Sequence, residues 1–190
     1  TAFDVSSASY VQRFIISAQE NYPQGVQFNN NGTKMYVIGS NGDEVNEYSL
    51  STAFDVSTAA YTQVFSVNSQ DINPSGLVFN NNGTKMFVVG DQGNDVNEYS
   101  LSTAFDVSTA SYVQNLSVSS QDTGPSGIAF NNDGTKMFVV GSTGDDVNEY
   151  SLSTGFDVST ASYVQNFSVA AQDASPMGLT FNNDGTKMFV

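Results

Sequence analysis

The stretch Asn131–Gly141 reads Asn-Asn-Asp-Gly-Thr-Lys-Met-Phe-Val-Val-Gly, and the rest of the chain is organised around it. An apolar run, Gly127–Phe130, leads into it, and a second apolar run, Met137–Val140, leads out. An Asp-Gly or Asn-Gly pair between two such runs is a strong signal for a β-hairpin, because the turn needs a positive φ that glycine adopts without steric cost. The sequence therefore predicts a hairpin here. Versions of the same stretch begin at Asn29, Asn80 and Asn182, each 51 residues from the next.

The whole chain follows this 51-residue period. The phrase Thr-Ala-Phe-Asp-Val-Ser opens the chain and returns at Thr52, Thr103 and, with Gly in place of Ala, Thr154. Repeats of about 40 to 50 residues with several β signals each are typical of propeller blades, and the 3.6-residue pattern of helical repeats is missing. The sequence predicts an all-β chain, a β-propeller or propeller segment over residues 1–190. Its repeats are 1–51, 52–102, 103–153 and the incomplete 154–190.

Each repeat contains four β-prone runs, which we name strands A, B, C and D. The first repeat places them at residues 24–29, 34–39, 45–50 and 61–67, with equivalents one period further on. Strands A and B are apolar at consecutive positions, so both of their faces must be covered. Strands C and D mix polar and apolar residues, as strands nearer to solvent do. A two-layer sandwich would instead show alternation in every strand, so this gradient favours four-stranded antiparallel blades that pack between neighbours.

Aromatic residues recur at fixed places in the repeat. One phenylalanine stands in each polar connection from strand C to strand D, and we interpret it as a packing anchor. The Asp that follows it suits an Asx turn or a short helical cap. These phenylalanines are Phe54, Phe105 and Phe156. The expected core consists of Phe28, Val37, Phe79, Phe87, Val89, Phe130, Phe138, Val140, Phe181 and Phe189, with Tyr48, Tyr99 and Tyr150 alongside.

Composition excludes several functions. The chain has 19 acidic against 5 basic residues and a formal net charge of −14, which repels nucleic acid and anionic lipid and attracts cations and basic partners. Cysteine and histidine are both absent, which removes disulfides, thiolate chemistry, the usual general base and the commonest metal ligand. No apolar run approaches ~18 residues, so we expect no membrane insertion. The N-terminal residues lack a charged and apolar leader.

Two phrases carry a resemblance to known repeats. Phe130–Gly141 resembles the Phe-Ser-Pro-Asp-Gly-Thr-Lys-x-Tyr-Val segment of YVTN and related NHL and WD40-like β-propeller repeats. Asn97–Ala110 is similar to tandem repeats in large bacterial surface and phage-tail-like proteins. The resemblance implies a propeller fold and a secreted, cell-surface or virion-associated setting, but those families share no single activity. The Gly-His and Trp-Asp pairs of WD40 repeats do not occur here.

The connections from D to A and from B to C share one face of a propeller, and we expect that face to be acidic. Carboxylates beside backbone carbonyls suit Ca²⁺. An Asp-x-Asp-x-Asp-Gly loop is absent, however, and Asp-rich turns are ordinarily solvated, so no cofactor is the main expectation and calcium the weaker one. The weak calcium candidates are Asp71, Asp122, Asp173, Asp145 and Asp146. The opposite face is expected to carry Lys34, Lys85, Lys136 and Lys187.

Repetition also bears on activity. Near-identical repeats place every carboxylate in nearly the same environment, whereas an active site needs unlike residues that converge on one point. We therefore expect a non-catalytic binding or scaffold module, with a protein or glycan ligand, rather than an enzyme. The alternative is a calcium-dependent propeller hydrolase, lactonase or lyase. The first repeat is the least regular, which marks either an end cap or a contact site. The possible contact face comprises Glu20, Tyr22, Asp43, Glu44 and Asp95.

Closure of the ring is the last expectation. The chain begins just before a D strand and stops within strand B of its fourth repeat, whereas four full repeats need 204 residues. A four-bladed ring would be small and would leave the edge of the strand at Lys187–Val190 exposed. We therefore expect that the segment does not close alone. Either two copies form a ring of about eight blades around a two-fold axis, or the segment belongs to a longer repeat array.

Overall fold

The four β-prone runs of each repeat form four antiparallel strands in the computed structural model, which describes residues 4–190. Blade 1 contains β1 (Pro23–Phe28), β2 (Lys34–Gly39), β3 (Glu44–Leu50) and β4 (Ala59–Ser66). Blade 2 contains β5 (Pro74–Phe79), β6 (Lys85–Gly90), β7 (Asp95–Leu101) and β8 (Ala110–Ser117). Blade 3 contains β9 (Pro125–Phe130), β10 (Lys136–Gly141), β11 (Asp146–Leu152) and β12 (Ala161–Ser168). A hairpin of β13 (Thr180–Phe181) and β14 (Met188–Phe189) follows, which we call the C-terminal hairpin.

Short 3₁₀ helices complete the repeat. One of them, η1 (Val5–Ser7), precedes blade 1, and the others stand between the third and fourth strands of each blade. Those three are η2 (Val56–Thr58), η3 (Val107–Thr109) and η4 (Val158–Thr160). No helix within residues 4–190 is long and apolar enough to cross a membrane.

The hairpin turn that the sequence predicts is present in every repeat. Between β5 and β6 the turn passes through Gly83, whose φ of +71° lies in the left-handed region that favours glycine. The Asn80 side chain accepts a hydrogen bond from the backbone N–H of Lys85 at 2.9 Å, and the Asn82 side chain accepts one from the N–H of Thr84 at 3.1 Å. The asparagines therefore satisfy backbone donors that the turn leaves without a strand partner.

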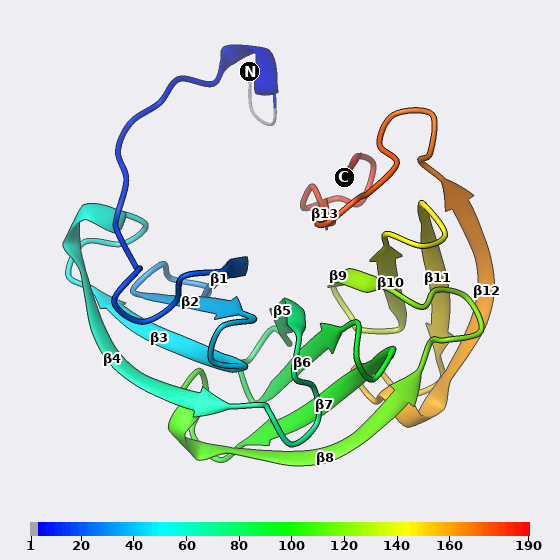
Figure 1. Cartoon of the computed structure of the whole chain (residues 1–190), viewed down its shortest axis with the longest axis horizontal. Helices are drawn as coiled ribbons and strands as arrows, with labels where there is room; N and C mark the ends of the chain where they lie inside the picture. The colour runs from blue at the N-terminus through cyan, green and yellow to red at the C-terminus, as the bar shows by residue number, and fades with distance from the viewer. Residues whose placement is uncertain (1–3) are drawn as a thin grey trace.

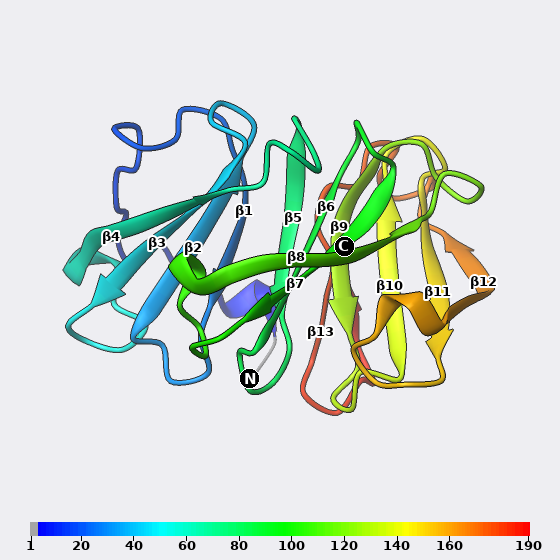
Figure 2. The ribbon, with the colours of Figure 1, turned by 90° about the horizontal axis from the view of Figure 1, so that it is seen from below.

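The blades are arranged side by side as an open arc (Figure 1). The first strand of each blade, β1, β5 or β9, lies on the inside of the arc, and the fourth strand lies on the outside. Seen from below, the three sheets stand next to one another; the inner strands run across the thickness of the arc, and the strands turn toward the direction of the arc on the outside, most clearly at β8 (Figure 2). The N-terminal segment and the C-terminal hairpin lie on either side of the opening. The propeller class is thus confirmed, with three complete blades and part of a fourth.

The expected burial gradient is only partly right. The fourth strands are the wettest, as expected, and every residue of β8 is exposed or half-buried. The third strands are not wet: in β7 every residue except Ser100 is buried. The expectation of a wet strand C was wrong because its polar residues, Asn97 and Glu98, are buried against partners rather than turned to water.

The core lies between blades rather than inside one sheet. One cluster joins residues of β2 and β3 to residues of β5, β6 and β7, and the next joins blade 2 to blade 3 in the same way. Buried as predicted are Val37, Phe79, Phe87, Val89, Val140, Tyr48, Tyr99 and Tyr150. Only half-buried, in contrast to the prediction, are Phe28, Phe130, Phe138, Phe181 and Phe189. Three buried methionines were missed, namely Met35, Met86 and Met137.

Two of the half-buried phenylalanines show what limits burial at their positions. Phe130 ends a first strand and borders the hollow on the inside of the arc. Phe138 stacks against Phe181 with ring centroids 4.6 Å apart, on the side of blade 3 that only the C-terminal hairpin covers. The incomplete fourth blade thus leaves Phe138 half-buried, whereas its equivalent Phe87, next to the complete blade 3, is fully buried.

The D strand expected ahead of the first blade does not form. Residues 8–16 have no strand assignment, yet Phe14 and Ile16 pack on the core cluster of blade 1 that contains Tyr48 and Leu50. The side chains thus take the positions of a fourth strand, while the backbone lacks the neighbouring third strand to which it would hydrogen-bond.

Candidate functional site

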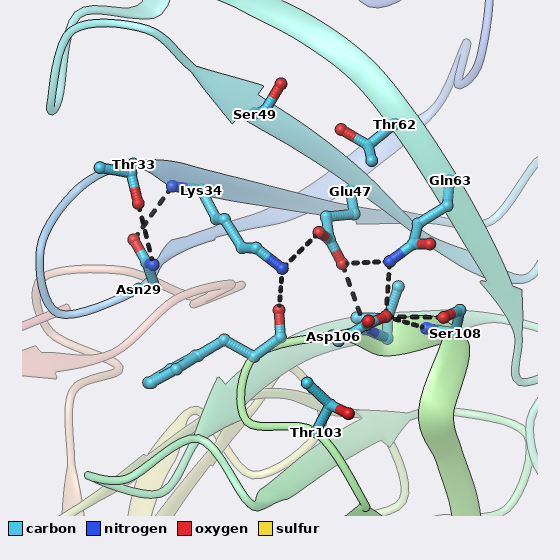
Figure 3. Close-up of polar contacts among 12 residues, drawn as sticks. Asn29, Thr33, Lys34, Glu47, Ser49, Thr62, Gln63, Thr103, Asp106 and Ser108 are labelled. Carbon is cyan, nitrogen blue, oxygen red and sulfur yellow. Dashed lines mark hydrogen bonds and ion pairs between the residues drawn. The ribbon is translucent and has the colours of Figure 1, made fainter.

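A buried carboxylate stands at the junction between blades 1 and 2. Glu47 lies in the middle of β3, opposite Gln63 on β4, and a break in the β3–β4 register directly follows it. Its side chain is only 2% exposed, and one carboxylate oxygen lies 2.7 Å from the Lys34 ammonium. The other oxygen accepts hydrogen bonds from the Gln63 amide at 2.9 Å and from the backbone N–H of Val107 at 3.1 Å (Figure 3). The buried charge is therefore both paired and hydrogen-bonded.

The partner from blade 2 is the loop between β7 and β8. Phe105 adopts a φ of +58°, which turns its carbonyl oxygen toward blade 1. That oxygen accepts hydrogen bonds from the Lys34 ammonium and from the Tyr36 hydroxyl, both at 2.7 Å. The next residue, Asp106, caps η3 and also accepts from the Gln63 amide at 2.7 Å. Hydrogen bonds from Ser108 hold the pKa of Asp106 below its ordinary value. The Lys, Glu and Gln side chains of one blade thus bind one loop of the next blade, and we call this arrangement the blade junction.

The blade junction recurs one period further on. Glu98 lies 2.7 Å from the Lys85 ammonium and accepts from Gln114 at 2.9 Å and from the N–H of Val158 at 3.2 Å. Lys85 donates to the Phe156 carbonyl at 2.5 Å. Recurrence of the same contacts at two places shows that they belong to the repeat itself. Lys34 and Lys85, which the sequence assigned to the face opposite the acidic one, are therefore half-buried and tied into the junctions.

The acidic residues that precede each first strand also have structural partners. Asp122 is buried and accepts hydrogen bonds from the N–H of Gly124 at 2.6 Å and from the N–H of Gly144 at 2.9 Å. It therefore ties the start of β9 to the turn between β10 and β11. A methyl group at Gly141 would clash with this carboxylate, so the glycine that ends the second strand leaves room for it. Glu20 and Asp71 are buried at the equivalent places, whereas Asp173 is exposed.

Asp71 differs from Asp122 in one respect. It accepts from the N–H of Asn73 at 2.7 Å, but its second carboxylate oxygen is buried without a hydrogen-bond partner. Burial raises the pKa of Asp71 above its ordinary value, and the nearby carboxylates of Asp95 and Asp91 add to the shift. The sequence-based view of these acids as solvated turn residues is therefore wrong for Glu20, Asp71 and Asp122.

The acids of the turns between second and third strands divide into two groups. The first group, Asp43 and Asp145, adopts φ of +52° and +50° and is half-buried. The second group is equivalent to Glu44 and binds asparagine amides: Asp95 accepts from Asn97 at 2.6 Å, and Asp146 accepts from Asn148 at 2.6 Å. Across residues 4–190, no three His, Cys, Asp or Glu side chains gather as a metal-binding group. Of the proposed contact face, only Tyr22, at 65% exposed, projects clearly into solvent.

The inside of the arc forms a hollow of about 960 Å³. It is bordered by the first strands and by the turns that follow them, and one asparagine of each turn reaches the next repeat. Asn30 donates to the Asn81 carbonyl at 2.5 Å, Asn81 donates to the Asn132 carbonyl, and Asn132 donates to the Asn183 carbonyl at 3.2 Å. We call this row the asparagine ladder.

Sequence reasoning found the acidic and lysine positions but missed the glutamate of strand C, the glutamine of strand D and the asparagine ladder. Their signal was present, because each recurs at the 51-residue period within a strand or turn that was otherwise well predicted. What the sequence did not show was that each of these residues also binds a residue of the next repeat.

No family model matches the chain, and no curated protein matches it by sequence. Solved structures do match. A candidate 6-phosphogluconolactonase from Bacteroides uniformis superposes with a TM-score of 0.63 at 12% identity, over 87% of this chain and 46% of that one. A functionally unknown protein from Desulfotomaculum acetoxidans gives 0.62 at 19% identity, over 90% and 51%. A chain of a mitotic checkpoint complex gives 0.58 at 8% identity, over 87% and 44%. The chain spans about half the length of these structures, and at such identities the likeness shows the propeller fold alone.

Proposed function

We propose that this chain is a non-catalytic binding or scaffold module, built as part of a fuller propeller and presenting the same loops several times. One observation carries the proposal: the recurring buried carboxylates accept hydrogen bonds that hold the strands, turns and blades of the fold together. Glu47 serves the blade junction, and Asp122 ties a strand to a turn of its own blade. Neither stands beside an unlike group in a cavity, as an acid–base pair would.

The proposed ligand is a protein or a glycan, bound in a secreted, cell-surface or virion-associated setting. The net charge of −14 disfavours nucleic acid and favours a basic or neutral partner. Repeated loops suit a ligand that is itself repeated, because linked sites can raise the overall affinity by about 10²- to 10⁴-fold without a new contact. Completion of the propeller comes either from a second copy, giving about eight blades, or from further repeats in a longer array.

The proposal is tested by binding to a panel of glycans and basic peptides, each presented both as a soluble single unit and at high density on a surface. We expect binding of one class of ligand that is at least tenfold tighter on the dense surface. Equal affinity in both formats would contradict the multivalent part of the proposal, and binding of nothing in the panel beyond buffer controls would contradict the binding part.

The second candidate function is a calcium-dependent lactonase. It is favoured by the fold, because one similar structure is a periplasmic gluconolactonase from Pseudomonas aeruginosa, at a TM-score of 0.52 and 17% identity. A ligand that binds only the folded state raises the melting temperature. We expect neither a calcium-dependent rise in the melting temperature nor hydrolysis of gluconolactone above buffer. Hydrolysis that calcium stimulates and that Asp122→Asn abolishes, in a variant that stays folded, would replace the scaffold proposal by the enzyme.

A further inference from the structure

The first blade has an apolar surface that the other blades bury. Val26 on β1 is 60% exposed, whereas its equivalents Leu77 and Ile128 are 8% and 6% exposed. The difference arises because Leu77 packs on residues of blade 1, and Ile128 packs on residues of blade 2. Around Val26 lies a groove of about 320 Å³ with an apolar lining, which we call the blade 1 groove. Its other main residues are Phe14, Ile16, Met35, Val37 and Val56.

The opposite end of the arc has a matching open position. Neighbouring first strands approach closely at a glycine: a methyl group on Gly76 would lie 3.1 Å from Cα of Gly127, and one on Gly127 would lie 3.1 Å from Cα of Gly178. A methyl group on Gly178 would meet nothing within 4 Å. Gly178 thus presents to solvent the surface that the preceding glycines use for contact with the next blade.

The polar contacts of the blade junction extend to the same two ends. Lys34 and Lys85 donate to carbonyl oxygens 71 residues further on, those of Phe105 and Phe156. Phe54 stands one period before Phe105, at a φ of +59°, and presents the equivalent carbonyl. Lys187 occupies the equivalent lysine position beside β14 and is exposed. Blade 1 therefore presents the carbonyl group, and the C-terminal hairpin presents the ammonium group, that a further blade junction would need.

We propose that the C-terminal hairpin of one copy docks in the blade 1 groove of a second copy, and that the reciprocal contact closes a two-copy ring. In each contact Lys187 of one copy donates to the Phe54 carbonyl of the other, and Gly178 faces Gly25. The asparagine ladder continues from Asn183 to the Asn30 carbonyl. The inference rests on the proposed function in one respect, namely that the arc is part of a fuller propeller.

The curvature of the arc favours a second copy over closure within one chain. The three blades and the C-terminal hairpin cover about half of the propellers to which the chain is similar, and the two ends lie on either side of a wide opening (Figure 1). Two arcs can be related by a two-fold axis that coincides with the central axis of the ring, which brings each C-terminal hairpin to the groove of the other copy. Two-fold symmetry is the simplest closed symmetry.

The contact is expected to be weak. At the junction of blades 1 and 2 the equivalent groove is filled by Tyr36, Ile38 and Val45. The C-terminal hairpin brings Phe189 to the place of Tyr36, but residues 181–190 contain no counterpart of Ile38 or Val45. We therefore expect half-dissociation at a concentration on the order of micromolar or higher, well short of an obligate dimer. A copy of residues 140–153 added after Val190 would supply both missing side chains and should tighten association at least tenfold.

The experiment measures mass by sedimentation and light scattering over a hundredfold range of concentration. We expect the mass to rise from 20.3 kDa to twice that value and to stop there. Gly178→Val adds bulk where the chain itself has nothing nearby, so the variant should keep the circular dichroism spectrum of the parent and remain at the monomer mass. Val26→Asp, on an exposed side chain of the other surface, should do the same. Ala60→Leu also adds three carbon atoms, at an exposed residue of the outer strand β4, and should associate like the parent.

A chain that stays monomeric at every concentration, with and without the 14-residue addition, would overturn the inference. So would a Gly178→Val variant that dimerises like the parent, or a mass that grows past two copies. None of these results bears on the calcium, lactone and ligand measurements, so the two-copy ring can fail while the scaffold proposal stands. A lactonase result would likewise leave the ring untouched.

Discussion

The junction between blades 2 and 3 and the open side of blade 3 contain the same residues in different surroundings. In both places a lysine and a glutamate lie 2.7 Å apart and a glutamine donates to the glutamate. At the junction the Glu98 side chain is 2% exposed and also accepts from the N–H of Val158. On the open side the Glu149 side chain is 14% exposed and Lys136 is 53% exposed. Among residues 4–190, no loop of a further blade contacts them. The contribution of this ion pair to stability therefore depends on the presence of a neighbouring blade and not on the local sequence.

The largest expected effect comes from removal of the glutamate, which should differ between the two places. Glu98→Ala leaves the half-buried Lys85 without its charge partner and the buried N–H of Val158 without its acceptor. Loss of one partner of a buried charge pair costs about 3–5 kcal/mol, and we expect the lower end of that range. Glu149→Ala removes a more solvated pair and should cost about 0–1 kcal/mol. Urea unfolding, followed by circular dichroism, measures both. Equal losses for the two variants would show that the neighbouring blade adds nothing to the ion pair.

A smaller effect is expected from the phenylalanines of the C-to-D loops. Phe105 is half-buried and lies 5.5 Å from the Phe79 ring, whereas Phe54 is 59% exposed. Both adopt nearly the same positive φ, of +58° and +59°, so the backbone strain is the same at both positions. A difference in stability between the two alanine variants therefore measures the packing of the rings. Truncation of a fully buried phenylalanine costs about 3–5 kcal/mol, so we expect about 2–3 for Phe105→Ala and about 1 or less for Phe54→Ala. If Phe54→Ala were the more destabilising, this assignment of the core would be wrong.

The dependence of stability on pH should differ in sign between two aspartates. The pKa of Asp71 is raised in the folded chain by burial, so the folded state retains a proton that the unfolded state loses above its ordinary pKa. Its contribution to stability therefore falls as pH rises from the unfolded pKa to the folded one. The pKa of Asp106 is lowered by Ser108, so its contribution is present above the unfolded pKa and disappears as pH falls through the folded one.

The test compares Asp71→Asn and Asp106→Asn with the parent by urea unfolding at several pH values below 7. As the pH rises through the acidic range, ionisation of Asp71 should lower the free energy of unfolding of the parent, and the Asp71→Asn variant should not show this decrease. Over a more acidic range, ionisation of Asp106 should raise the free energy of unfolding of the parent as the pH rises, and the Asp106→Asn variant should not show this increase. The same change in slope for both variants would mean that the two carboxyls do not differ in their folded surroundings.

The hairpins and the period were predictable from sequence because each depends on residues close together in the chain. Gly83 and its neighbouring asparagines predict the turn, and the recurrence of the pattern every 51 residues predicts the blade. The burial of Glu98 was not predictable in this way. In the phrase Val-Asn-Glu-Tyr-Ser-Leu its charge indicates a solvated strand, and the Val158 N–H that helps to bury it lies 60 residues further on. Asp122 was misjudged for the same reason, since its second partner is Gly144, 22 residues away.

The asparagine ladder also gives the chain a direction. Every bond of the ladder runs from an amide in one repeat to a carbonyl in the next, as do the lysine bonds of the blade junction. A surface of this kind cannot pair with an identical surface, because donors would meet donors. Contacts between such units are head-to-tail, and they either close after a whole number of units or continue without end. A small change in the rotation between blades would therefore convert a ring of finite size into a helical filament.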